Sequence, residues 1–100
     1  MRHRVILSLR AQAELATRGR WWRKNRPYNP QLLRQEVGDA LDLLAQRPEA
    51  GAAAENAGPY VRKILLPRTQ CYVYYRVDRA ERIVLILSFW HTARLRPPQV

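Results

Sequence analysis

Residues 60–98 read YVRKILLPRTQCYVYYRVDRAERIVLILSFWHTARLRPP, which is the pattern of three consecutive β-strands. The side chains of residues 61–67 alternate between two faces, and Pro67 then starts a turn because proline fixes φ and cannot donate to a strand ladder. Residues 71–77 are rich in aromatic and β-branched side chains, which suit a pleated, half-buried surface. Residues 83–90 are almost wholly apolar, so we expect them to form the central strand, buried on both faces.

The N-terminal half predicts one strand and two helices. Residues 2–7 form a short strand, and Ser8 is a good N-cap for a helix over residues 9–24. Asn29 is expected to cap a second helix over residues 30–46, in which apolar side chains recur at the helical period. The two helices should therefore form an antiparallel hairpin.

These elements predict an α+β fold of order β-α-α-β-β-β. The helix hairpin packs on one face of a small, mostly antiparallel sheet. Residues 52–59 are a connection of small residues, which we expect to be mobile. A chain of 100 residues has room for one hydrophobic core, so we expect a single domain over residues 1–100.

The composition favours an anionic partner. The net charge is +10, carried by 16 arginines and two lysines against eight acids. Such a balance suits nucleic acid or an acidic protein segment, and it does not choose between them. No apolar run approaches the roughly 20 residues of a membrane helix, and residues 5–9 are too short for the apolar part of a signal peptide. We therefore expect a cytoplasmic protein without membrane contact, in which the single Cys71 is a small buried side chain.

The order of residues resembles the RelE/ParE superfamily of toxins from bacterial toxin–antitoxin modules. The resemblance rests on the basic strand start at Val61-Arg62, the tyrosine-rich strand ending Tyr74-Tyr75-Arg76-Val77, and the hydrophobic strand that runs into Trp90-His91-x-x-Arg94. It implies the fold order given above and neutralisation of the toxin by an acidic antitoxin protein. No cofactor is implied, and His3, His91 and Cys71 make no set of metal ligands.

The resemblance is closer to the ParE branch, whose members inhibit DNA gyrase by binding it. The RelE branch contains ribosome-dependent nucleases, and there the resemblance places a catalytic arginine where this chain has Tyr72. Those nucleases also carry a tyrosine near the C-terminus, and this chain has none after Tyr75. The alternatives are a RelE-type metal-independent endoribonuclease that acts on mRNA at the ribosome, and a non-toxic member of the family.

Four residues are candidates for catalysis if the chain is a nuclease. His91 follows the buried strand and could move a proton, because imidazole titrates near neutrality. The arginines could stabilise the negative charge of a phosphorane. The alternative is a histidine that binds backbone at a strand end. The arginines in this set are Arg68, Arg76 and Arg94.

Two further sets are candidates for protein binding. Residues 18–26 hold five basic side chains and two tryptophans without an acid, and arginine and tryptophan are typical interface anchors. The alternative is a solvated helix end with Trp22 in the core. Tyr74 and Tyr75 are expected to lie on opposite faces of their strand as core residues. The target-binding set is Arg94, Arg96, Arg18, Arg20, Trp21 and Arg23, and the antitoxin-binding set is Arg62, Arg68 and Tyr72.

Overall fold

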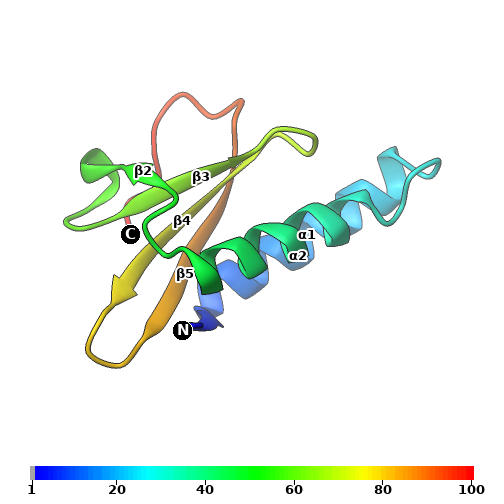
Figure 1. Cartoon of the computed structure of the whole chain (residues 1–100). Helices are drawn as coiled ribbons and strands as arrows, with labels where there is room; N and C mark the ends of the chain where they lie inside the picture. Colours follow the sequence, from blue (N-terminus) through cyan, green and yellow to red (C-terminus); the bar gives the residue numbers. More distant parts are fainter. Residues whose placement is uncertain (1) are drawn as a thin grey trace.

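The computed structural model describes residues 2–100 and shows two helices packed on a five-stranded mixed sheet (Figure 1). The predicted order β-α-α-β-β-β is confirmed, with one short strand added between the second helix and the last three strands. The elements are β1 (Arg4–Leu7), α1 (Leu9–Asn25), α2 (Leu32–Gln46), β2 (Ala52–Ala53), the 3-10 turn η1 (Glu55–Ala57), β3 (Arg62–Leu66), β4 (Cys71–Asp78) and β5 (Ile83–His91).

The sheet has the strand order β1-β5-β4-β3-β2. β1 is parallel to β5, and the other neighbours are antiparallel, as a meander of hairpins requires. The prediction that residues 83–90 form the central strand is wrong in one respect. β5 is an interior strand between β1 and β4, but the middle position belongs to β4 because β2 adds a fifth strand beyond β3.

Ser8 caps α1 as predicted, since its hydroxyl oxygen accepts a hydrogen bond from the Ala11 amide at 3.0 Å. The predicted start of α2 is wrong. Gln31 is the N-cap residue and makes no side-chain cap, while the Asn29 carbonyl oxygen accepts the indole N–H of Trp22 at 2.8 Å. This tertiary bond holds Asn29 in the preceding turn. Within residues 2–100 no helix is long and apolar enough to cross a membrane.

Residues 52–59 are not the irregular connection that their small side chains predicted. Ala52 and Ala53 pair with Lys63 and Arg62, so they extend the sheet beyond β3. The chain then passes through η1 to Gly58. Backbone hydrogen bonds rather than side-chain pattern define this strand, which explains why an alanine-rich sequence did not reveal it.

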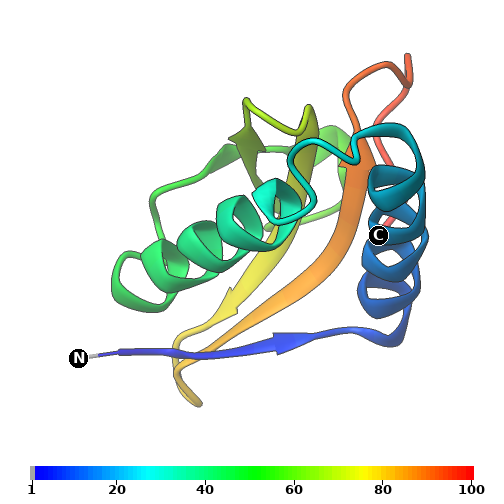
Figure 2. The same ribbon diagram turned by 90° about the vertical axis from the view of Figure 1, so that its right-hand side faces the viewer.

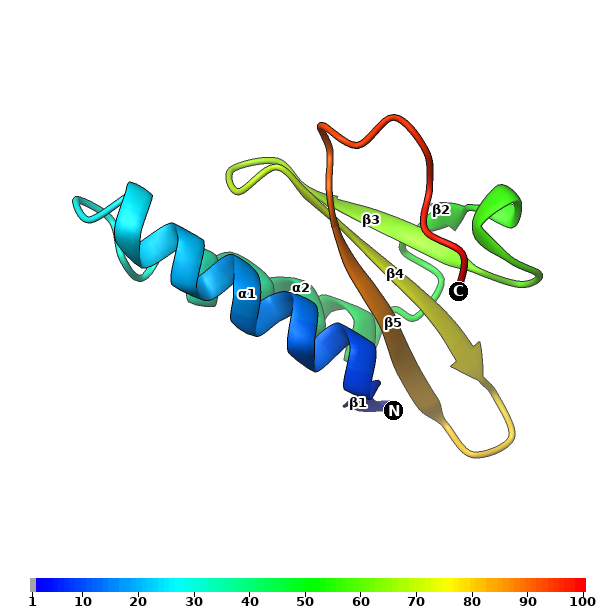
Figure 3. The ribbon, with the colours of Figure 1, turned by 180° about the vertical axis from the view of Figure 1, so that it is seen from behind.

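The sheet has an apolar core on each face. Both helices cover the first face (Figure 2), where the core includes Val37, Leu44, Val73, Tyr75 and Ile86. On the second face, a smaller core is closed by the C-terminal segment, which runs back across the strands (Figure 3). The alternation predicted for the tyrosines is confirmed: Tyr72 and Tyr74 contact the second core, whereas Val73 and Tyr75 belong to the first.

A β-bulge in β5 interrupts its alternation. Tyr74 pairs with Ser88 but Tyr75 pairs with Ile86, so Leu87 is an extra residue on β5. Strict alternation from Ile86 would place Phe89 on the second face, yet it packs in the core beneath the helices. The bulge therefore turns Phe89 and the alternate residue His91 toward α1, and it turns Trp90 toward the second face.

Candidate functional site

The C-terminal half of β5 lies beside α1 instead of β1. The last β1 residue, Leu7, pairs with Ile86, and beyond this point side chains of α1 take the place of a neighbouring strand. The Ser8 hydroxyl donates to the Leu87 carbonyl at 3.2 Å, and a Glu14 carboxylate oxygen accepts the Phe89 amide at 3.3 Å. The end of β5 is thus held against α1 while its last side chains reach the surface.

A pocket of about 380 Å³ opens between α1 and the end of β5, and we call it the α1–β5 pocket. Its inner wall contains the buried Cys71 and Phe89, and burial raises the pKa of the Cys71 thiol. Two separate sequence predictions meet here, because His91 and Arg94 share the pocket with Arg18 and Trp21. The complete lining is Ala13, Glu14, Thr17, Arg18, Trp21, Cys71, Phe89, His91 and Arg94.

His91 is held in one tautomer by its own backbone. Its Nδ1 accepts the Ala93 amide at 3.0 Å, which leaves the proton of the neutral ring on Nε2. Burial and the nearby positive charges of Arg18 and Arg94 lower the pKa of His91. The ring is therefore a neutral hydrogen-bond donor at pH 7, and this bond fits the strand-end alternative noted from the sequence.

Arginines stack on two tryptophans on this side of the molecule. Trp21 has the Arg18 and Arg26 guanidinium carbons at 4.4 and 5.3 Å from its ring centroid. Trp90 has Arg94 at 4.0 Å and Arg10 at 5.6 Å. Arg94 joins the two stacks because it also lines the α1–β5 pocket. We call this group the arginine–tryptophan surface: Arg10, Arg18, Trp21, Arg26, Trp90 and Arg94.

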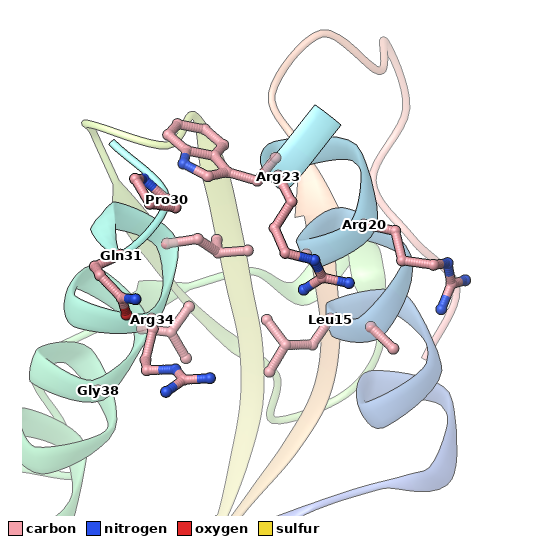
Figure 4. Close-up of a pocket in the computed structure, with 12 residues that line it drawn as sticks. Leu15, Arg20, Arg23, Pro30, Gln31, Arg34 and Gly38 are labelled. Atoms are coloured by element: carbon pink, nitrogen blue, oxygen red, sulfur yellow. The ribbon is translucent and has the colours of Figure 1, made fainter. Parts of the chain in front are cut away.

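A second and larger hollow of about 560 Å³ lies between the helices, and we call it the interhelix groove. Its lining is apolar and includes Leu15, Trp22, Leu33 and Val37. Figure 4 shows its charged rim: Arg23 from α1 and Arg34 from α2 reach toward the space, whereas Arg20 points away from it.

The predicted target-binding set is divided between these places. Arg18, Trp21 and Arg94 line the α1–β5 pocket, but Arg20 and Arg23 lie along the interhelix groove on another side of α1. Arg96 is exposed in the C-terminal segment, where its carbonyl oxygen accepts the Trp90 indole N–H at 2.9 Å. The basic residues at the end of α1 are therefore divided between the α1–β5 pocket and the interhelix groove.

The predicted catalytic set converges on His91 only in part, because Arg94 shares its pocket whereas Arg76 and Arg68 do not line it. Arg76 donates to the carbonyl oxygens of Pro59 and Val100, at 3.1 and 3.4 Å. It pairs with Leu85, whereas Cys71 pairs with His91, so five residues or about 17 Å of strand separate it from that end of the sheet. Arg68 lies in the β3–β4 turn with an exposed side chain.

The predicted antitoxin-binding set is not gathered on one surface. Arg62 is tied to the chain before β2, since its guanidinium donates to the Gly51 carbonyl at 2.8 Å. Tyr72 lies on the second face with the Lys63 amine 4.5 Å from its ring centroid. Arg68 lies in the turn beyond both. The role of these three residues stays a prediction.

The interhelix groove was missed in the sequence, although two glycines mark it. Gly19 and Gly38 stand inside helices, where glycine costs about 1 kcal/mol relative to alanine. A Cβ at Gly38 would meet nothing within 4 Å, and at Gly19 only the Arg23 side chain at 3.6 Å. Glycine at both positions widens the space between the helices, so these two glycines were the feature of the sequence that could have revealed the groove.

Comparison with known proteins gives one family and several structures of the same fold. A family model described as the ParE toxin of the type II toxin–antitoxin system parDE matches residues 5–96. No curated protein sequence is significantly similar to the chain. Among solved structures, the chain is similar to a chromosomal ParDE toxin–antitoxin system from P. aeruginosa, with 20% identity and a TM-score of 0.73 over 89% of this chain and 95% of that chain.

Two further structures have the same fold. The toxin–antitoxin complex RelBE2 from Mycobacterium tuberculosis is 21% identical, with a TM-score of 0.67 over 91% of this chain and 99% of that one. A mutant of the E. coli toxin RelE in the free state is 20% identical, with a TM-score of 0.62 over 93% of this chain and 86% of that one. At such identities, the likeness shows the fold alone.

Proposed function

Because the chain belongs to the ParE family of toxins from type II toxin–antitoxin systems, we propose that it inhibits DNA gyrase by binding and that a cognate antitoxin neutralises it. The similar structures from P. aeruginosa and Mycobacterium tuberculosis are toxin–antitoxin systems, which supports an antitoxin partner. A protein-binding toxin needs a rigid contact surface more than it needs a convergent set of catalytic groups.

The arginine–tryptophan surface carries the target-binding part of the proposal. Arg18 and Arg94 are stacked on Trp21 and Trp90, and stacked side chains lose little conformational freedom on binding. Tryptophan and arginine are also the residues that most often dominate interface energies. His91, in contrast, has its Nδ1 engaged by the Ala93 amide, and Arg76 lies five residues of strand away from it.

The interhelix groove is the proposed binding site of the antitoxin. Its apolar lining suits the apolar side of an amphipathic segment that folds on binding. Arg23 and Arg34 on its rim would pair with acids of that segment (Figure 4). Such a segment would cover Leu15, which the chain alone leaves half-buried at the edge of the groove.

The test of target binding is gyrase supercoiling and cleavage assays with the purified protein. Charge reversal at Arg94 and Arg96 should abolish inhibition while the thermal melt stays unchanged. Charge reversal at Arg4 and Arg47 is the matched control, because these arginines are exposed and make no side-chain hydrogen bond within residues 2–100. Full inhibition by the Arg94 and Arg96 variant would reject this surface.

The groove is tested by co-purification with the cognate antitoxin. Gly38→Trp should block its binding by filling the space between the helices, whereas Gly38→Ala should leave it intact. Equal co-purification with both variants would place the antitoxin elsewhere.

A ribosome-dependent endoribonuclease is the second candidate, because neutral His91 shares its pocket with Arg18 and Arg94. Mapping of mRNA ends after induction separates the two functions. Codon-linked cleavage that His91→Gln abolishes would support the nuclease, whereas a DNA-damage response with intact mRNA would support gyrase. No growth defect at all would favour a non-toxic member of the family.

A further inference from the structure

The α1–β5 pocket combines apolar walls with basic side chains. It is an open recess of about 380 Å³, and Ala13, Trp21, Cys71 and Phe89 form its apolar walls. Cys71 and Phe89 are 2% and 6% exposed, so the inner wall belongs to the core and is fixed in shape. A ligand with a short apolar stem would contact these walls.

Arg18 brings a positive charge with a spare donor to this pocket. One of its terminal nitrogens donates to the Thr69 carbonyl at 3.0 Å, and its plane stacks on Trp21. Its Nε–H is buried, with only the weakly accepting Cys71 thiol near it in the described part of the chain. A ligand would therefore bind the terminal N–H groups of Arg18 that do not donate to Thr69.

Two further donors line the same pocket. The His91 ring is neutral with its proton on Nε2, because Nδ1 accepts the Ala93 amide. The Arg94 guanidinium carbon lies 4.0 Å from the Trp90 ring centroid, and its N–H groups make no hydrogen bond among residues 2–100. The pocket therefore offers hydrogen-bond donors from three side chains and two positive charges.

The one acid in the lining does not cancel these charges. Glu14 accepts the Ser88 hydroxyl at 2.8 Å and the Phe89 amide at 3.3 Å. Its second oxygen pairs with Arg10 at 3.5 Å, one turn earlier on α1. Glu14 is thus held by β5 and by its own partner, and Arg18 and Arg94 keep their excess charge.

We propose that the α1–β5 pocket receives one acidic side chain, a glutamate or aspartate, from a protein partner. A planar carboxylate matches the guanidinium fork of Arg18 or Arg94, and its methylene stem would lie against Trp21 and Phe89. A nucleic-acid phosphate fits less well, because it carries no apolar stem to lie against the walls that Trp21 and Phe89 form. The proposal rests on the proposed function only in assuming a protein partner.

Titration with two blocked peptides tests the pocket. The probes are acetyl-Ala-Glu-Ala-amide and its glutamine analogue, added to the isotope-labelled protein while the Arg18 Nε–H and Trp21 Nε1–H resonances are followed by NMR. The glutamate peptide should shift both resonances saturably, and the glutamine peptide should bind at least about tenfold more weakly, as expected for charge-assisted hydrogen bonds.

Two variants keep the test decisive. Arg18→Met should abolish the saturable shift of Trp21, but it also removes the hydrogen bond from Arg18 to the Thr69 carbonyl. Arg94→Met is therefore the second variant, because the Arg94 side chain makes no hydrogen bond among residues 2–100. Arg94→Met should weaken the glutamate peptide about tenfold, and Arg47→Met, an exposed control, should not change its affinity.

Three results would overturn the proposal. They are equal binding of the two peptides, no saturable shift, or a stronger effect of inorganic phosphate or an oligothymidylate on the same resonances. Gyrase is absent from this experiment, so a failure of gyrase inhibition leaves the peptide result standing, and a failure of the peptide leaves the gyrase assay standing.

Discussion

Glu36 in α2 holds Thr69 in the β3–β4 turn by two hydrogen bonds to one carboxylate oxygen. Oε1 accepts the Thr69 hydroxyl at 2.6 Å and the Thr69 amide at 2.8 Å, while Oε2 accepts the Arg68 amide at 2.9 Å. From the other side, Arg18 of α1 donates to the Thr69 carbonyl. This turn, although it joins two strands, is positioned by both helices.

Glu36→Ala should lower the free energy of unfolding by about 2–3 kcal/mol. The substitution leaves two backbone amides and the Thr69 hydroxyl without their charged acceptor, and Thr69 is only 1% exposed, so water does not replace that acceptor easily. Urea unfolding followed by circular dichroism measures the change.

Asp39→Ala is the control for Glu36→Ala, since Asp39 is an exposed carboxylate on the same helix without a side-chain hydrogen bond in the described chain. It should change the free energy of unfolding by less than about 0.5 kcal/mol. Similar unfolding midpoints for the two variants would show that the turn does not depend on α2.

The strands and helices could be predicted because their side chains carry the pattern. The apolar run of β5 and the helical period of α2 are set by burial, which acts on side chains. β2 and the start of α2 could not be predicted, because backbone pairing with β3 and the bond from Trp22 to Asn29 define them. Such contacts are made by backbone groups and leave no periodic pattern of apolar side chains.

The candidate site was predictable in its residues but not in its geometry. His91, Arg94, Arg18 and Trp21 were all singled out from the sequence, and the structure brings them into one pocket. That meeting depends on the bulge at Leu87, which turns His91 toward α1. No glycine marks this bulge, so alternation alone would place His91 on the opposite face.

Tyr75→Phe should destabilise the fold by about 1–3 kcal/mol. The Tyr75 hydroxyl is buried, accepts the Gly51 amide at 2.8 Å and donates to the Pro48 carbonyl at 2.8 Å, so its removal leaves both groups without a partner. Tyr74→Phe is the control, because the Tyr74 hydroxyl makes no hydrogen bond within the described residues. Thermal unfolding should show the larger loss for Tyr75→Phe, and an equal loss would contradict the role of this bridge.

Replacement of Gly51 and of Gly38 by alanine should change the stability of the protein in opposite directions. At Gly51 a Cβ would lie 2.6 Å from the Tyr75 hydroxyl and 2.7 Å from the Lys63 carbonyl, so Gly51→Ala should cost about 1–3 kcal/mol through overpacking. At Gly38 the space is open, and Gly38→Ala should stabilise α2 by about 0.5–1 kcal/mol. Melting temperatures of the two variants that move in the same direction would refute this assignment of space.

Acid should destabilise the native protein partly through His91. Burial, Arg18 and Arg94 lower its pKa below the ordinary histidine value, so the unfolded chain takes up a proton at a pH where the folded ring stays neutral. The contribution of His91 is therefore complete above the ordinary pKa of about 6.5, and it is lost as the pH falls from there through the lowered value. Protonation at Nδ1 would also break the bond from the Ala93 amide.

His91→Gln removes this titration, so its unfolding midpoint in urea should fall less between pH 8 and pH 5 than that of the native protein. The carboxylates titrate in both proteins, and the difference between them isolates the ring. Arg94→Met should raise the pKa of His91 toward its ordinary value, because it removes one of the two positive charges that act on the ring. An NMR titration of the His91 ring measures that pKa directly, and a value at or above the ordinary one in the native protein would mean that the ring is not held neutral between Arg18 and Arg94.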